Sequence, residues 1–422
     1  MPLVVWGYIG LSSGTDNVIA ALEKRDRVRD VNFNVADRQL HKVLAAMQVP
    51  FPELTDLQLS SNGETIPVIP DSFLDGSATR LRRFTLHGIP FPGLHKLLPS
   101  ATHLVSLSLT NIPHSGYISP EAILALISVL SRLEILSLEF GSPQSRPDRE
   151  TRRPPPSKRS VIPALNGFYF KGVIEYLEDL VTDIDTPQLK RMHITFFNQI
   201  DFDTPRLVQF INRTPKLENQ DARVHFYDHL ALLILSLDTL EIKISCKEPD
   251  WQLSSVEQVC DSFFHPLSTA EDLYIEHQYS ELVWRDEAIE NTQWLQLFLP
   301  FAAVKNLYLS KEFAPGIAAA LQETVEGRIT EVLPGLKNIF VEGLDPSGLF
   351  QKNIGRFLAA RQLSDHSIAI SDWNKNPFRY PSPVFPDPQS YVPLPAGNPS
   401  SAPPPAQGLP DPHPYVLPPV RY

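Results

Sequence analysis

Cysteine is scarce in this chain, because only Cys246 and Cys260 occur among 422 residues. A protein of this length from an oxidising compartment usually carries more, and neither residue has a partner at zinc-ligand spacing. Cys260 falls on the apolar stripe of an expected helix, where it is most simply a small core residue. We therefore expect reduced thiols, no metal site, and a cytoplasmic or nuclear protein.

Long hydrophobic runs are also missing. The most apolar internal run covers residues 230–237, whereas a membrane helix needs about twenty apolar residues. The apolar start, residues 1–14, lacks the basic segment that is typical of a signal peptide. We expect no membrane partner.

Basic charge is in short supply, with 37 Lys and Arg against 48 Asp and Glu and a net charge of -11. A surface that binds nucleic acid needs clustered positive charge, so a nucleic-acid partner is not expected. The phosphate loops G-x-G-x-x-G and G-x-x-x-x-G-K-[ST] and the zinc motif H-E-x-x-H are absent. We therefore predict no catalytic residues and no cofactor; an enzyme whose site these patterns do not reveal is the alternative.

What the chain does contain is a recurring hexapeptide, apolar-x-x-apolar-x-apolar, which returns about ten times between residues 54 and 341. Its last three positions alternate as a half-buried strand requires. The copies are residues 54–59, 81–86, 104–109, 133–138, 165–170, 189–194, 237–242, 270–275, 304–309 and 336–341. The return of such a strand is the leucine-rich-repeat signature, and it predicts an α/β solenoid over residues 1–373.

Helix signals fall between these strands. Ser119 before Pro120 is the best of them, Thr204 before Pro205 repeats the device, and Ser255 is read as a third N-cap. We expect a curved parallel sheet of about eleven to thirteen strands, with helices on the convex side and a capping helix at residues 349–358. The unit at Leu217 breaks the hexapeptide and is expected to be bulged.

Two segments stand outside the repeats. Residues 142–160 combine six basic side chains with Pro154, Pro155 and Pro156, so we expect a solvated insertion loop; a nuclear-import or acidic-partner patch is the alternative. Residues 374–422 are proline-rich and are expected to form a disordered tail. A ligand for an SH3-like or WW-like domain is the alternative for the tail.

Four stretches together resemble the leucine-rich region of large F-box proteins of basidiomycete fungi: VVWGY (residues 4–8), NVIAALEKRDRV (17–28), FPELTDLQL (51–59) and IPHSGYISPEAI (112–123). The resemblance implies a non-catalytic protein-interaction solenoid that captures substrates for a ubiquitin ligase. The F-box that would bind the cullin-ligase adaptor is not seen, so that partner is expected only if an F-box lies upstream. A plain scaffold, or a truncated remnant without a ligase link, is the alternative.

The predicted binding surface is the concave face of the sheet. Side chains between the apolar strand positions stack there in columns about 4.8 Å apart. The middle column begins with small polar residues, such as Gln58 and Thr85, and becomes aromatic later. Large aromatic residues supply much of the contact energy in protein interfaces. The predicted partner-binding residues are Tyr169, His193, Tyr274, Tyr308 and Phe340. The alternative is that the C-terminal segment or the tail covers these rings.

Overall fold

The computed structural model describes residues 1–9, 15–35, 37–61, 68–144, 159–199, 201–217, 221–235, 239–246, 248–263, 267–277, 290–324, 331–345 and 347–374. All of them belong to one unit, Met1–Asn374. Most of the predicted basic insertion, residues 145–158, and the predicted tail, from residue 375 onward, lie outside the described residues.

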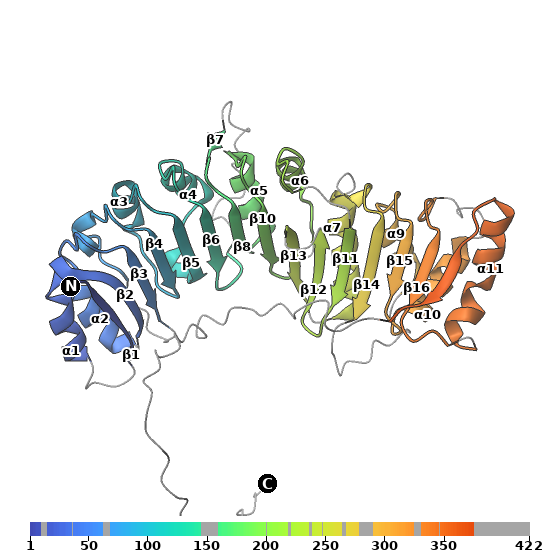
Figure 1. Cartoon of the computed structure of the whole chain (residues 1–422), viewed down its shortest axis with the longest axis horizontal. Coiled ribbons are helices and arrows are strands. Elements are labelled where there is room, and N and C mark those ends of the chain that lie inside the picture. The colour runs from blue at the N-terminus through green and yellow to red at the C-terminus, as the bar shows by residue number, and fades with distance from the viewer. Residues whose placement is uncertain are drawn as a thin grey trace, which may run out of the picture. The chain divides into compact units, whose positions relative to one another are not determined.

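Fifteen strands stand side by side in one continuous row (Figure 1). In spatial order they are β1 (Leu3–Ile9), β2 (Val28–Val35), β3 (Asp56–Ser60), β4 (Arg83–His87), β5 (Ser106–Ile112), β6 (Ile135–Phe140), β8 (Gly167–Gly172), β10 (Arg191–Phe196), β13 (Leu240–Ser245), β12 (Leu230–Leu235), β11 (Asp221–Phe226), β14 (Asp272–His277), β15 (Asn306–Leu309), β16 (Asn338–Val341) and β17 (Ala369–Asp372). A small parallel pair, β7 (Ser160–Val161) and β9 (Ile184–Asp185), is separate. The row exceeds the predicted number of strands because five of its strands, β1, β2, β11, β12 and β17, do not carry the hexapeptide.

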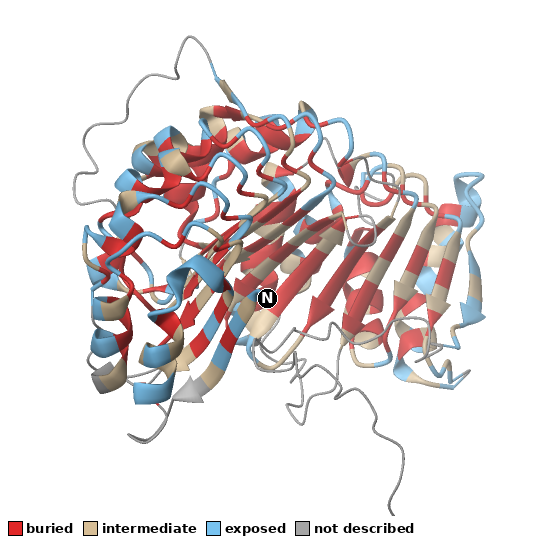
Figure 2. Ribbon diagram, turned by 60° about the vertical axis from the view of Figure 1, so that its left-hand side comes forward, coloured by how far each residue is buried: buried red, intermediate tan, exposed pale blue. Residues whose placement is uncertain are grey.

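Each hexapeptide forms a turn followed by a strand. In the copy at residues 133–138, Leu133 ends the preceding turn, and β6 starts at Ile135. Leu133, Leu136 and Leu138 are all buried, whereas Ile135 is only half-buried. Figure 2 shows the same alternation of buried and intermediate bands along neighbouring strands. One side of the sheet is therefore core, and the other is left open.

Helices supply the other half of the core. They are α1 (Thr15–Leu22), α2 (Asp37–Ala46), α3 (Leu94–Leu97), α4 (Pro120–Ile127), α5 (Ile174–Thr182), α6 (Pro205–Asn212), α7 (Pro249–Ser262), α9 (Asn291–Phe298), α10 (Ala314–Glu323) and α11 (Leu349–Leu363). Between β3 and β4 the short 3-10 helix η2 (Phe73–Gly76) occurs where other units have an α-helix. Helix and strand side chains form one continuous hydrophobic cluster along the row.

The three predicted helix starts have different outcomes. Ser119 is confirmed as the N-cap of α4, since its hydroxyl accepts a hydrogen bond from the Ala122 N–H at 3.2 Å. Thr204 makes no side-chain cap; the Glu178 carboxylate of α5 instead accepts N–H bonds from the first turn of α6 at 3.0 and 2.7 Å. The prediction for Ser255 is wrong, because α7 already begins at Pro249 and Ser255 lies buried inside it.

The predicted all-parallel sheet is wrong in one place. β12 runs antiparallel to both β11 and β13, so the three strands form a meander inserted between β10 and β14. The short links 227–229 and 236–239 allow only hairpins, because a parallel crossover needs a dozen or more residues. The unit at Leu217 leads into β11, which pairs in parallel with β14; the expected bulge falls at residues 218–220, which lie outside the described residues. The fold is mixed α/β with a large, mostly parallel sheet.

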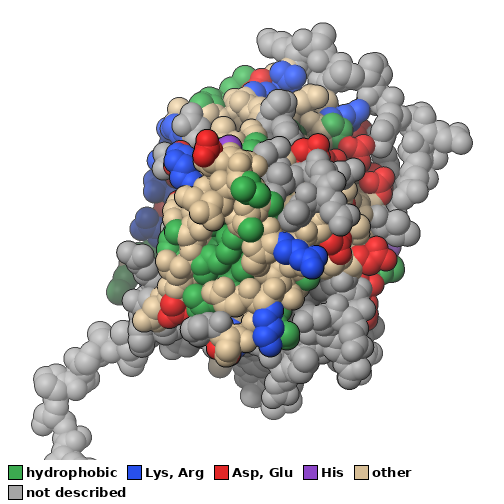
Figure 3. All heavy atoms as spheres, turned by 90° about the vertical axis from the view of Figure 1, so that its right-hand side faces the viewer, with side chains coloured by type: hydrophobic (Ala, Val, Ile, Leu, Met, Phe, Trp, Pro, Cys, Tyr) green, Lys and Arg blue, Asp and Glu red, His purple; other side chains and the backbone are tan. Residues whose placement is uncertain are grey.

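The C-terminal end of the row is held by a buried cation. Arg361 of α11 is 0% exposed and donates to the carbonyl oxygens of Val332 and Leu333 at 2.7 and 2.8 Å. The predicted helix at residues 349–358 is present and continues to Leu363. Figure 3 views this end, where hydrophobic side chains gather among charged ones. No helix in the described ranges has the length and apolarity needed to cross a bilayer.

Candidate functional site

The side of the sheet without helices, called the open face below, carries one unbroken central column of paired residues. In spatial order from β1 to β17 the column is Trp6, Asn32, Gln58, Thr85, Ser108, Ser137, Tyr169, His193, Glu241, Ile234, Arg223, Tyr274, Tyr308, Phe340 and Ser371. All five predicted site residues therefore lie in this column. They fall in two groups, which the meander separates.

Tyr274, Tyr308 and Phe340 form the larger group, called the ring ladder below. The Tyr274 and Tyr308 rings stack with centroids 4.2 Å apart and an interplanar angle of 8°, and Tyr308 stacks on Phe340 at 4.6 Å and 10°. Each ring is half-buried. Because the three rings stack nearly parallel and in close contact, the ladder forms a continuous aromatic ridge on the open face.

Trp373, which follows β17, packs against this ridge. Its ring lies 6.0 Å from that of Tyr274 and 5.5 Å from that of Tyr308, and its backbone N–H donates to Val341 at 2.8 Å. The alternative reading was that the C-terminal segment covers the rings. In the structure one side chain of that segment, Trp373, contacts two of them. Trp373 is itself half-buried, so the ladder and this ring present a combined surface.

A polar ladder runs beside the rings, two positions earlier on the same strands. Asn306 donates from its side-chain amide to the Asp272 carboxylate at 2.7 Å, and Asn338 donates to the Asn306 side-chain oxygen at 2.7 Å. All three side chains are half-buried. The open face of β14, β15 and β16 therefore offers an apolar ridge next to a row of hydrogen-bonding groups.

The smaller aromatic group is electrostatically linked to the meander. Tyr169 stacks on His193 with centroids 5.1 Å apart, and His193 Nδ1 lies 3.5 Å from Glu241 Oε1. Lys243 Nζ approaches the same oxygen at 2.5 Å. Burial by itself raises the pKa of Glu241, but hydrogen bonds from His193 and Lys243 outweigh it and lower the pKa to about 2. Glu241 is thus a fixed anion.

Arg223 of β11 lies against the ring ladder, on the far side of the meander from Glu241. Its guanidinium carbon lies 4.0 Å above the centre of the Tyr274 ring, and its nitrogens approach Asp221 at 3.4 Å and Glu276 at 3.8 Å. Arg223 is absent from the predicted site residues, because the meander that brings β11 beside β14 was not expected from the sequence. An Arg and a Tyr at paired positions of neighbouring strands indicate a cation–π contact. Only the correct strand order places Arg223 beside Tyr274.

No group of three or more His, Cys, Asp or Glu side chains among the described residues is arranged to hold a metal ion. Cys246 and Cys260 are both free and buried, and burial raises the pKa of each thiol, which keeps it protonated.

One short sequence pattern is typical of a catalytic turn. Residues 10–14, GLSSG, have the G-x-S-x-G spacing of hydrolase nucleophile turns and connect β1 to α1. They lie outside the described part of the chain, so the pattern stays a sequence observation. A single short pattern of this kind arises easily by chance.

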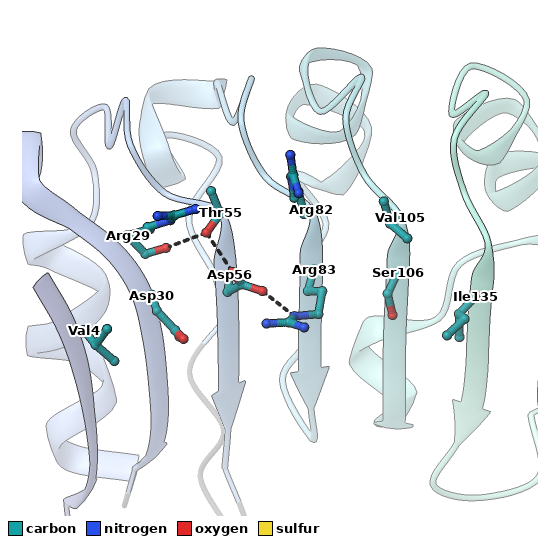
Figure 4. Close-up of a pocket in the computed structure, with 10 residues that line it drawn as sticks. All are labelled: Val4, Arg29, Asp30, Thr55, Asp56, Arg82, Arg83, Val105, Ser106 and Ile135. Carbon is teal, nitrogen blue, oxygen red and sulfur yellow. Dashed lines mark hydrogen bonds and ion pairs between the residues drawn. The ribbon is translucent and has the colours of Figure 1, made fainter. Parts of the chain in front are cut away.

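A shallow hollow of about 650 Å³ lies at the other end of the open face, over the first halves of β1 to β6 (Figure 4). Its floor is the column two positions before the central one, and its rim is formed by the residues just before the floor. The floor residues are Val4, Asp30, Asp56, Arg83, Ser106 and Ile135, and the rim residues are Arg29, Thr55, Arg82 and Val105. This hollow was not predicted from the sequence.

Comparison with known proteins gives no assignment. No model of a known protein family matches the chain, and no curated protein matches it at a significant level.

Proposed function

We propose that the chain is a non-catalytic protein-interaction module whose partner binds the ring ladder. One observation carries the proposal: the register position that holds Tyr274, Tyr308 and Phe340 on β14 to β16 holds Gln58, Thr85 and Ser108 on β3 to β5. The same kind of sheet forms around either set. The rings are therefore not required to build the strands.

The chemistry of the surface supports a protein partner. Half-buried aromatic rings held rigid by stacking lose little conformational entropy on contact, and such residues dominate the energy of protein interfaces. The Asp272, Asn306 and Asn338 ladder supplies polar groups beside them. Tyr169 and His193 extend the proposed surface across the meander.

A more specific proposal is that the unit is a leucine-rich-repeat solenoid with the open face concave, related to the substrate-capturing part of F-box ubiquitin-ligase receptors. The hexapeptide array and the regular β–α alternation support it. On this proposal the protein acts in the cytoplasm or nucleus, binds a protein and not a nucleic acid, and contacts a cullin-ligase adaptor only through an F-box. A plain scaffold without a ligase link has the same open face.

The competing function is an enzyme. The GLSSG stretch at residues 10–14 is the observation that favours it, since the pattern occurs between a strand and a helix, as in hydrolases. Replacing Ser12 by alanine separates the two: hydrolysis of a panel of nitrophenyl esters that disappears in S12A supports the enzyme.

The proposal is tested by photo-crosslinking. The full chain carries p-benzoylphenylalanine either in place of Tyr308 or, as a control at the same register position, in place of Thr85. We expect defined protein adducts from a cell extract at position 308 and few at position 85. Equal labelling at both positions contradicts the ring ladder as the binding surface. The presence of a cullin adaptor among co-purifying proteins tests the ligase link separately.

A further inference from the structure

In the hollow at the N-terminal end of the open face, the two aspartates Asp30 and Asp56 differ in their partners. Asp56 is engaged, because the Thr55 hydroxyl donates to it at 2.7 Å and Arg83 forms an ion pair with it. Asp30, its neighbour in the column, is half-buried, and no hydrogen bond or ion pair from a described residue reaches its carboxylate. A half-buried carboxylate without a hydrogen-bond or ion-pair partner favours the approach of a cationic group from a binding partner.

The two ends of the hollow are apolar. Val4 of β1 is 59% exposed and lies at one end, and Ile135 of β6 is half-buried at the other. Arg83 stands between them, 69% exposed at its side chain, with guanidinium donors left over from its bond to Asp56. Along the floor the order is thus apolar, acidic, acidic, basic, polar and apolar.

The spacing of this order fits an extended polypeptide that crosses the strands. Neighbouring strands are about 4.8 Å apart, so Val4 and Ile135 are separated by about 24 Å along the column. Side chains on one face of an extended peptide recur every 6.6 to 6.8 Å, roughly. A peptide with an apolar residue over Val4 then places its next same-face side chain between Asp30 and Asp56, and the following one near Arg83. The strand backbones bond to each other, so side chains must make the contacts.

We propose that this hollow is a second protein-binding site, which takes an extended segment with the same-face pattern apolar, basic, acidic, polar, apolar. The choice rests on charge complementarity. A nucleic acid would bring phosphates onto Asp30 and Asp56, which repel them. A small anion could contact the exposed Arg83 and the rim arginines, but it would leave Asp30 and the two apolar ends without a contact. The site is separate from the ring ladder, so either one can fail without the other.

The test uses the full chain and two fluorescein-labelled nonapeptides of identical composition. Leu-Ser-Lys-Ser-Glu-Ser-Thr-Ser-Leu has the matching charge order, and Leu-Ser-Glu-Ser-Lys-Ser-Thr-Ser-Leu has the order swapped. Exposed ion pairs change affinity by roughly two- to fivefold each, so fluorescence anisotropy should favour the matching peptide by about fivefold. The preference should fall to about twofold in Asp30→Asn, because this variant weakens the contact with the peptide Lys and keeps the contact between the peptide Glu and Arg83.

Asp26→Asn is the matched control, because Asp26 is exposed on the 3-10 helix η1 (Arg25–Arg27) and is absent from the hollow lining. This variant should keep the full preference. The proposal is overturned if neither peptide binds at millimolar concentration, if the two bind equally, or if Asp30→Asn and Asp26→Asn behave alike. Melting curves of both variants should match the parent chain, since each substitution is isosteric.

Discussion

The two ends of the open face differ while the covered face stays the same. On β3 to β6 the central column consists of Gln58, Thr85, Ser108 and Ser137, whereas on β14 to β16 it consists of stacked rings. Toward the helices, both regions bury apolar side chains to similar extents. The fold therefore constrains one face of each strand and leaves the other face free to vary. Side chains on the free face are the ones that reveal function.

The meander lies between these two regions and adds charged residues to the central column. It brings Glu241, Ile234 and Arg223 into the column between His193 and Tyr274. Glu241 and Arg223 are held by ion pairs, and Arg223 also lies on the Tyr274 ring. The ring ladder is thus anchored on one side by fixed charge and on the other by Trp373.

The largest effect is expected on the covered face, where the two regions should respond alike. Leu136→Ala in β6 and Leu307→Ala in β15 each remove a fully buried side chain from the same cluster. Each should lower the free energy of unfolding by about 2 to 5 kcal/mol, because a cavity remains after the methyl groups are lost. Urea unfolding followed by circular dichroism measures both. A loss in only one region would mean that the two halves do not share one core.

A smaller, pH-dependent effect is expected at the meander. The folded-state pKa of Glu241 is about 2, below its usual 4.5, so its stabilisation is present above pH 4.5 and is lost as pH falls toward 2. Glu241→Gln should therefore lower the free energy of unfolding at pH 6 by on the order of 2 kcal/mol, and variant and parent should converge near pH 2.

The control for this titration is Glu271→Gln. Glu271 pairs with Lys305 at 2.6 Å, but its side chain is 56% exposed, and exposed pairs contribute little. Urea unfolding at pH 6, 4 and 2.5 should give nearly parallel curves for this variant and the parent. A constant difference between Glu241→Gln and the parent at all three values would contradict the assigned role of the ion pairs.

The smallest stability effect is expected when the ring ladder is given the chemistry of the other region. Tyr308→Thr introduces the residue that Thr85 provides in β4, and threonine suits a strand. The loss of two ring stacks should cost about 1 to 2 kcal/mol, less than either core substitution. Thermal melting checks this. Unfolding of the variant at 25 °C would show that the rings belong to the core.

Much of the sheet could be predicted from the sequence, because burial on one face imposes a spacing that can be read directly. The copy at residues 304–309 predicts β15, and Leu307 and Leu309 are buried as the pattern requires. Ser119 could be predicted as a cap because it acts on its own helix. Thr204 could not, since the cap of α6 comes from Glu178 on another helix.

The meander could not be predicted from spacing alone. Residues 230–237 look like part of a repeat unit, yet β12 within them is an extra strand of opposite direction. Direction depends on the length of the links, which the hexapeptide does not encode. The five predicted site residues do lie in one column, but the three strands of the meander between His193 and Tyr274 were not expected in that order. The N-terminal hollow could not be predicted, because its floor residues are of different chemical types and follow no sequence pattern. Only the strand register brings them together.

The most direct measurement compares partner capture by two double variants of the full chain. Tyr274→Thr with Tyr308→Thr alters the ring ladder, and Gln58→Thr with Ser108→Thr alters the same column at the other end. The partner is the protein that crosslinks at position 308, and its recovery is quantified beside a thermal melt of each variant. We expect the ring variant to lose at least about tenfold in recovery while it stays folded, and the control to lose nothing. Equal recovery from both variants, or loss of binding only together with unfolding, would contradict the ring ladder as a surface for binding.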